Sequence, residues 1–328
     1  MSVRDGACAE PYGAEGATKR QEASYVCNLS PDLIAKAETE LNEKPEWRSR
    51  DVQALRDMVL SHPGLKSRTD DEFLLRFLRA RKFDYDRAFA LLLEYFTVRA
   101  KHRDIFQGCV PSKLLHVFDT KISLVLPNRD RNGNRMVFFR PGRWDHSNYP
   151  IMDVLKLNVV QLEEAIKDDA TQICGIVVIC DYADLTLSHV KNLDREYVKL
   201  MTSMMQDAFP MRIKAVHMCN EPSVFGIAWA VIKPFIKDKI AQRIHFHGSD
   251  LTNLHSSVGL ENLPSDLGGH LPPADDLAKD WYDILQQDEE NFVDLLQYSL
   301  DLHYQPSKKD GEQVGDCLAG NYRNVNRD

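Results

Sequence analysis

The sequence predicts an α/β protein in which an all-helical unit precedes a mixed, mostly parallel sheet. Residues 30–103 show helical periodicity and no strand pattern, whereas strand-like and helical runs alternate over residues 120–250. Alternation of this kind implies mostly parallel strands, because each helix carries the chain back across the sheet. The run GIVVICDY (175–182) is apolar almost throughout, which is typical of a central strand buried on both faces.

The composition is that of an ordinary globular protein. The chain has 328 residues, of which 43% are hydrophobic and 27% charged, enough for one large or two modest domains. A formal net charge of −8 argues against nucleic acid as the main partner. No apolar run reaches the roughly 20 residues that span a bilayer, and the N-terminus lacks the apolar core of a secretory signal.

The seven cysteines are scattered along the chain and form no CxxC pair. Cys174, Cys180 and Cys219 lie in apolar runs, where a reduced cysteine behaves as a small hydrophobe. This usage predicts a reducing compartment, so we expect a cytoplasmic protein.

A helical domain is expected over residues 25–103, after a polar tail at residues 1–24 that we expect to be disordered. Ser30 is a good N-cap for its first helix, and His62-Pro63-Gly64 ends the second.

The third and fourth helices of this domain begin close together. We expect Thr69 to cap DDEFLLRFLRARKF, and Asp84 to start the helix after it. The basic side chains of the third helix are expected to lie mostly on a solvated face; they are Arg76, Arg79 and Arg81.

An α/β domain is expected over residues 111–272, followed by a C-terminal helix at 280–304 and a disordered tail at 305–328. Asn132-Gly133 is a hairpin signal between its first two strands. The predicted strands are 122–127, 136–141, 175–182, 213–220 and 243–247, and the predicted helices are 112–118, 150–167, 190–207 and 222–236.

The helix over residues 222–236 differs from the others because it is apolar nearly all round. It is too short to span a bilayer, so it is either a buried core helix or one that meets a lipid surface. Between residues 207 and 243, six Lys and Arg stand against three Asp and Glu, a local balance of +3 in an acidic chain. An apolar helix in a basic setting favours contact with an anionic membrane.

The sequence contains no strong catalytic or metal-binding motif, and GxGxxG, GxxxxGK[ST], HExxH and GxSxG are all missing. His245 and His247 alternate on a strand, but without a third ligand the simpler role is packing or hydrogen bonding. Asp181 follows the central strand, where α/β enzymes place catalytic acids, although a lone acid there more often caps a turn or binds a backbone amide. We therefore expect no enzyme activity, no metal and no cofactor.

Several segments that follow one another along residues 25–300 resemble the CRAL-TRIO lipid-binding family. They are DEFLLRFLRARKFDYDRA (71–88), GIVVICDY (175–182), FPMRIKAVHMCNEP (209–222), IKPFIKDKI (232–240), RIHFHG (243–248) and LPSDLGG (263–269). The resemblance implies a helical N-terminal domain and an α/β domain that holds one hydrophobic molecule between its sheet and a mobile gate helix. In this chain the gate is the apolar helix at 222–236.

The resemblance also implies a phosphoinositide-binding basic patch. By alignment with the family's tocopherol carriers, it falls on Arg81, Arg212, Lys214, Lys239 and Arg243. The simpler alternative for each residue is a surface charge without a partner, but all five positions are basic here.

The pocket that the resemblance implies draws on two helices, two strands and the gate. Its expected residues are Leu155, Asn158, Leu162, Val178, Cys180, Met201, Met204, Met205, Val216, Met218, Val224, Phe225, Ala228, Trp229, Ile232 and Phe235, any of which is otherwise plain core. Asn158 and Leu162 stand where the family's tocopherol carriers have serines, and Cys180 and the methionines replace a phenylalanine and aliphatics. Because methionine adapts to several shapes, the cargo is expected to be tocopherol or another lipophile.

The function expected from these features is an intracellular, non-enzymatic lipid carrier. It would take one hydrophobic lipid between membranes, docking transiently at endosomal or other phosphoinositide-bearing membranes. One alternative is a lipid-sensing adaptor whose ligand occupancy controls a protein partner. The other is an α/β enzyme that acts through Asp181, although no motif supports it.

Overall fold

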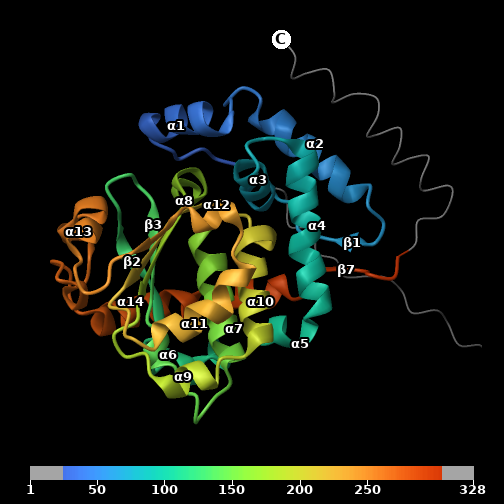
Figure 1. The fold of residues 1–328 in the computed structure, drawn as a ribbon. Helices are drawn as coiled ribbons and strands as arrows, with labels where there is room; N and C mark the ends of the chain where they lie inside the picture. Colours follow the sequence, from blue (N-terminus) through green and yellow to red (C-terminus); the bar gives the residue numbers. More distant parts are fainter. Residues whose placement is uncertain (1–24, 305–328) are drawn as a thin grey trace, which may run out of the picture.

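The computed structural model describes residues 25–304 and shows a group of N-terminal helices beside an α/β domain (Figure 1). The expectations for residues 1–24 and 305–328 lie outside the described residues. The N-terminal elements are α1 (Pro31–Leu41), α2 (Arg48–Leu60), β1 (Leu65–Lys66), α3 (Asp71–Ala80), α4 (Tyr85–Lys101) and α5 (Arg103–Phe106).

The N-terminal helices begin at polar caps and pack around an aromatic core. Ser30 caps α1 and Asp84 caps α4, as predicted. The cap of α3 is Asp70, which accepts from the Phe73 amide at 3.0 Å, so the prediction of Thr69 was wrong by one residue. Inside the domain the rings of Phe77 and Tyr95 meet edge to face at 5.5 Å.

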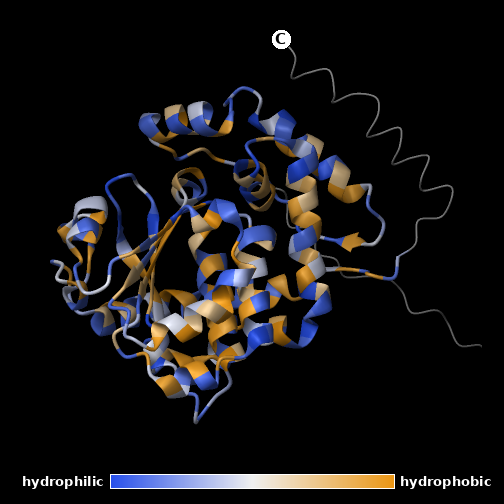
Figure 2. Cartoon of the chain, in the orientation of Figure 1, coloured by the Kyte–Doolittle hydropathy of each residue, from blue (hydrophilic) through white to orange (hydrophobic). Residues whose placement is uncertain are grey.

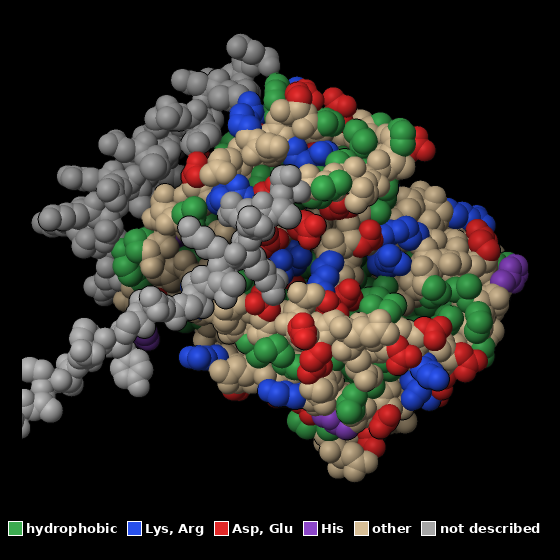
Figure 3. All heavy atoms as spheres, turned by 180° about the vertical axis from the view of Figure 1, so that it is seen from behind, with side chains coloured by type: hydrophobic (Ala, Val, Ile, Leu, Met, Phe, Trp, Pro, Cys, Tyr) green, Lys and Arg blue, Asp and Glu red, His purple; other side chains and the backbone are tan. Residues whose placement is uncertain are grey.

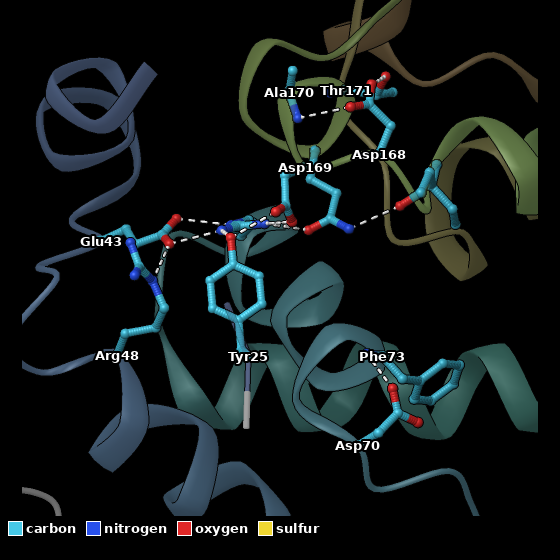
Figure 4. A network of polar contacts seen from close by, with 12 residues as sticks. Tyr25, Glu43, Arg48, Asp70, Phe73, Asp168, Asp169, Ala170 and Thr171 are labelled. Carbon is cyan, nitrogen blue, oxygen red and sulfur yellow. Dashed lines mark hydrogen bonds and ion pairs between the residues drawn. The ribbon is translucent and has the colours of Figure 1, made fainter. Parts of the chain in front are cut away.

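The prediction of a solvated basic face on α3 was wrong for two of its three arginines. Arg76 and Arg79 are 4% and 0% exposed, and only Arg81 is partly open to solvent. The Arg79 guanidinium forms ion pairs with Glu43 and Asp169, and Figure 4 shows both of these acids in the polar network. This face of α3 therefore packs against the α/β domain, and acidic partners compensate its charges.

The α/β domain contains a five-stranded sheet in the order β2-β3-β4-β5-β6. β2 and β3 are antiparallel, and each later pair is parallel, which confirms the mixed, mostly parallel sheet. The first five residues of β4 are buried, as expected of a central strand. The strands are β2 (Ser123–Arg129), β3 (Arg135–Phe139), β4 (Ile176–Asp181), β5 (Ile213–Cys219) and β6 (Ile244–Phe246).

Three helices, α7, α10 and α11, lie next to one another on one side of the sheet (Figure 1). The expected helix over 190–207 is instead α9 followed by α10, which continues as a π-helical turn at Met204–Ala208. The α-helices from this part of the chain are α6 (Leu115–Phe118), α7 (Ile151–Ala165), α8 (Asp169–Cys174), α9 (Leu187–Lys191), α10 (Arg195–Ser203), α11 (Phe225–Ile232), α12 (Asp238–Ala241) and α13 (Thr252–Val258). Short 3-10 turns cover Pro111–Lys113, Pro141–Arg143, Lys233–Phe235, Leu260–Asn262 and Ser265–Leu267.

The C-terminal segment differs from the single helix expected over 280–304. It forms α14 (Ala274–Gln287), α15 (Glu289–Leu295) and the short strand β7 (Ser299–Leu300). β7 pairs antiparallel with β1, Leu65 opposite Leu300, so the end of the described chain returns to the N-terminal helices. Periodicity alone does not reveal this pairing, because its partner lies far away in sequence.

Candidate functional site

A large apolar cavity lies between the sheet and helices α7, α10 and α11. Its volume is about 200 Å³, counted as the space that the centres of water-sized molecules can occupy. One water needs roughly 10–15 Å³ on that measure, so the cavity has room for an organic molecule. Among the described residues that line it, none is Lys, Arg, Asp or Glu.

The floor of the cavity comes from alternate residues of β4 and β5. Val178 lies opposite Val216, and Cys180 opposite Met218, in the parallel register of the two strands. Alternate side chains of a strand share one face, so all four point into the cavity as predicted.

Helices α7 and α10 provide two further walls. On α7 the lining residues Leu155, Asn158 and Leu162 are spaced by three and four, which places them on one helix face. At the end of α10, Met201 and the π-helical residues Met204 and Met205 also line the cavity. A π-helical turn is rare and frequently marks a functional site, and nothing in the sequence predicted it.

Helix α11 closes the remaining side of the cavity. Ala228, Trp229 and Ile232 line it as predicted, but Val224, Phe225 and Phe235 do not. Phe225 packs instead against Tyr182 at 4.7 Å between ring centroids, outside the lining. Val224 precedes α11, Phe225 is its first residue and Phe235 lies in the 3-10 turn after it, so all three lie at or beyond the ends of the helix.

The outer side of α11 is also apolar, and the helix is white to orange along its length in Figure 2. Ile227 is 53% exposed there, and the neighbouring Phe246 of β6 is 51% exposed. Helix α11 is therefore only partly buried, with Phe225 and Ala228 enclosed and Ile227 open to solvent.

Some lining residues were missed by the sequence analysis. Trp144 and His189 come from loops and a short helix, for which the sequence gives no spacing rule. Tyr197 lies four residues before Met201, so helical spacing would have found it. Other lining residues not predicted include Ile122, Val137, Phe139, Tyr182, Phe209, Ile213, Ile236, Ile240 and Ile244.

Three of the five predicted phosphoinositide-binding residues lie close together beside α12. Burial lowers the pKa of Lys239, and so does the positive charge of its neighbours Arg243, Arg81, Arg87 and Lys82. In the described part of the chain, no carboxylate forms an ion pair with any of them. We refer to Arg81, Lys82, Arg87, Lys239 and Arg243 as the basic cluster; Lys82 and Arg87 were not predicted.

The other two predicted residues, Arg212 and Lys214, are held by helix α1. Glu40 of that helix lies 3.4 Å from the Arg212 guanidinium and 3.2 Å from the Lys214 ammonium. Arg212 also donates to the carbonyl of Ile173.

Lys, Arg, Asp and Glu side chains are interspersed on the rear face of the molecule (Figure 3).

The residues considered for catalysis or metal binding make ordinary polar contacts. Asp181 accepts from the Asn220 side chain at 2.9 Å and from the Ala183 backbone at 3.1 Å, which confirms a turn-stabilising role. His247 hydrogen-bonds to His217 at 2.9 Å, and the ring of His245 stacks on His217 at 5.2 Å. Within residues 25–304, no three His, Cys, Asp or Glu side chains are arranged to hold a metal ion.

No helix in the described part of the chain combines the length and apolar character needed to cross a bilayer.

Comparison with known proteins identifies two domain types. The model of the CRAL/TRIO domain matches residues 119–269, and that of the Pinta-like UBA domain matches residues 44–113. The chain is 46% identical to "Alpha-tocopherol transfer protein-like" of Homo sapiens over 270 residues, 82% of this chain and 78% of that protein. It is 36% identical to "Clavesin-2" of Homo sapiens over 284 residues, 86% of each protein.

Proposed function

This chain belongs to the CRAL/TRIO domain family, and from that premise we propose that it is a carrier that encloses one hydrophobic molecule and moves it between membranes. The observation that carries the proposal is the cavity under α11, which has no charged lining residue among those described. Tocopherol, which the name of a relative mentions, is one candidate cargo.

The physical case for a closed cavity is the cost of exposing a lipid to water. A tail of about sixteen carbons is disfavoured in water by roughly 13 kcal/mol, at ~0.8 kcal/mol per CH₂. A carrier must therefore enclose the tail during transit and release it only against another apolar phase.

Helix α11 is the proposed gate. Its inner residues Trp229 and Ile232 cover the cavity, while Ile227 already faces outward. If α11 swings out at a membrane, its apolar surface passes from protein to lipid contact instead of water. This supports opening at the bilayer and closure away from it.

Docking is proposed to occur through basic residues near the gate. The basic cluster offers charges that the described chain leaves without acidic partners, each worth ~1 kcal/mol near an anionic surface. Arg212 and Lys214 would join it once Glu40 releases them. The proposed site of action is the phosphoinositide-bearing cytoplasmic face of endosomal or similar membranes.

The test is to expose the purified protein to a mixed lipid extract and to identify bound lipid by mass spectrometry. One water-insoluble species in stoichiometric amount, moving quickly from donor to acceptor vesicles, is the expected result. Retention of a lipid without transfer, together with ligand-dependent capture of a protein, would contradict the carrier and favour an adaptor. No lipid above background would reject both.

A further inference from the structure

One end of the cavity carries a cluster of polar groups. Near the carboxyl end of β4, the Cys180 thiol and the Tyr182 hydroxyl lie close enough to affect each other's pKa, and both residues line the cavity. Tyr197, from the first turn of α10, raises the pKa of Tyr182, and Cys180 raises the pKa of Tyr197, so the three side chains lie close together. We refer to Cys180, Tyr182 and Tyr197 as the polar corner.

From the polar corner the cavity becomes apolar along α10. Tyr197, Met201, Met205 and Phe209 all line it. Helix α10 and its π-helical turn continue for twelve residues from Tyr197 to Ala208, and at no more than about 1.5 Å each they give a path of up to roughly 18 Å. A long lipophile therefore fits with its head at Tyr197 and its tail toward Phe209.

The Tyr197 hydroxyl has no hydrogen-bond partner among the described residues, although its side chain is only 4% exposed. The Tyr197 hydroxyl is not among the described polar atoms that are fully buried without a hydrogen bond. It therefore borders open space, and the open space beside Tyr197 is the cavity. Of the other polar lining side chains, Gln161, Thr202, Gln206 and His189 each have protein partners. Asn158 on α7 is the remaining one without a described partner, since the Tyr182 hydroxyl lies beside the Cys180 thiol.

The cavity is suited to an uncharged head. Burial raises the pKa of the Cys180 thiol to about 12 and raises that of the Tyr197 hydroxyl far above its usual range, so both groups stay neutral. Burial also lowers the pKa of His189, which therefore favours its neutral form. A charged head would lie in this apolar space without a counter-ion, at a high desolvation cost.

We propose that the Tyr197 hydroxyl hydrogen-bonds to the head of the cargo, and that the cargo is an uncharged lipophile with a hydroxyl or carbonyl head. The inference rests on the proposed carrier function and adds a specificity-determining residue to it. An analogue that lacks the oxygen leaves Tyr197 buried and unpaired, so the protein discriminates against it.

The experiment uses an equimolar mixture of 1-octadecanol, cholesterol and α-tocopherol with their counterparts lacking the oxygen, octadecane, 5-cholestene and 6-deoxytocopherol, plus octadecanoic acid. Lipid retained by the full chain is quantified by mass spectrometry. Tyr197→Phe removes only the hydroxyl. Tyr149→Phe is the matched control, because the Tyr149 hydroxyl already bonds to Thr120 and does not line the cavity.

The expected result is that the wild-type protein prefers at least one alcohol over its hydrocarbon by tenfold or more. This ratio falls about tenfold in Tyr197→Phe, the value of one hydrogen bond, and is unchanged in Tyr149→Phe. An unchanged ratio in Tyr197→Phe, or a preference for octadecanoic acid, overturns the inference about Tyr197 and leaves the proposed carrier function standing. A ratio that is lost in Asn158→Leu but kept in Tyr197→Phe assigns the head to α7 instead. If the wild-type protein retains no lipid at all, the carrier function itself is rejected.

Discussion

The sheet domain meets two groups of helices through contacts of opposite kinds. The N-terminal helices contact it through buried charges: Arg79 pairs with Asp169 of α8, and Arg76 and Arg99 pair with Glu163 of α7. Helix α11 contacts it through aromatic and aliphatic side chains only, such as Trp229, whose ring lies 5.2 Å from that of Phe246.

The difference indicates which contact is able to open. Separating a buried ion pair leaves uncompensated charges, at a cost of about 3–5 kcal/mol. An apolar contact can be exchanged for contact with lipid tails, which are as apolar as leucine, at little loss. The ion-paired junction is thus suited to hold a fixed arrangement, and the apolar wall is suited to move.

The strongest test of the fixed junction is Arg79→Met. We expect the free energy of unfolding to fall by about 3–5 kcal/mol, because Glu43 and Asp169 lose the cation that compensates them. Urea denaturation measures the change. The control is Arg81→Met at the C-cap of the same helix, which forms no ion pair within the described residues and is expected to stay within about 0.5 kcal/mol. Equal losses in the two variants would show that the ion pairs do not hold the junction.

A second test concerns the strand that supports the mobile wall. His217 lies on β5 beside β6, and burial, followed by the charges of His247 and His245, lowers its pKa from 6.5 to about 4. Because the folded state binds this proton more weakly than the unfolded state, the stability that His217 contributes is full above pH 6.5 and is lost as the pH falls toward 4.

The nearby acids Asp130, Glu221 and Asp250 oppose the shifts of the histidine pair, but burial outweighs them. We expect stability to fall between pH 6.5 and pH 4, and to fall less steeply in His217→Asn. Urea denaturation across this range gives the slope, with exposed His303→Asn as the control. Identical slopes in the wild type and His217→Asn would contradict the assignment.

The two contacts also differ in how far the sequence predicted them. Much of the cavity lining was implied by the family resemblance, and simple spacing then accounts for it, as for Val178 with Cys180 on a strand or Leu155 with Leu162 on a helix. These spacings are local, so they can be recognised in the sequence without knowledge of the tertiary structure. Tyr197 obeys the same spacing but is not among the residues that the resemblance implies.

The burial of Arg76 and Arg79 at the ion-paired junction was not predicted, because their acidic partners are distant in the sequence. A basic helix face looks the same in sequence whether it is solvated or buried. The acids that compensate Arg79, namely Glu43 and Asp169, lie 36 and 90 residues away. The pairing of Glu40 with Lys214 spans 174 residues and was likewise invisible.

The mobile wall is tested by Ile227→Ser on the outer side of α11. Since Ile227 is 53% exposed, we expect unfolding to change by less than about 0.5 kcal/mol. Transfer between vesicles should slow severalfold, because an inserted gate loses apolar area. The control is Leu60→Ser on α2, because Leu60 is 67% exposed and does not line the cavity. If both variants transfer lipid at the wild-type rate, the outer side of α11 does not enter the bilayer.

The smallest expected effect comes from Glu40→Gln. Its contact is intermediate between the two kinds, because it is ion-paired but partly exposed to solvent. Glu40 ties α1 to Arg212 and Lys214 by charge, but its side chain is 37% exposed, so water screens these pairs and each is worth less than about 1 kcal/mol. A phosphoinositide headgroup carries more charge than one carboxylate and should compete successfully for the same cations.

Removing the Glu40 charge raises the local net charge by one, so it should tighten binding to phosphatidylcholine vesicles containing phosphatidylinositol bisphosphate by roughly fivefold, at ~1 kcal/mol per unit of charge near an anionic surface. Sedimentation with the vesicles measures this. Glu38→Gln, an exposed acid on the same helix, controls for the change in net charge. Equal binding by the two variants would mean that Arg212 and Lys214 serve only to hold α1, and that docking depends on the basic cluster alone. Tighter binding by Glu40→Gln would instead mean that α1 inhibits docking. An ion-paired contact that is weakened by solvent would then open as readily as the apolar contact of α11.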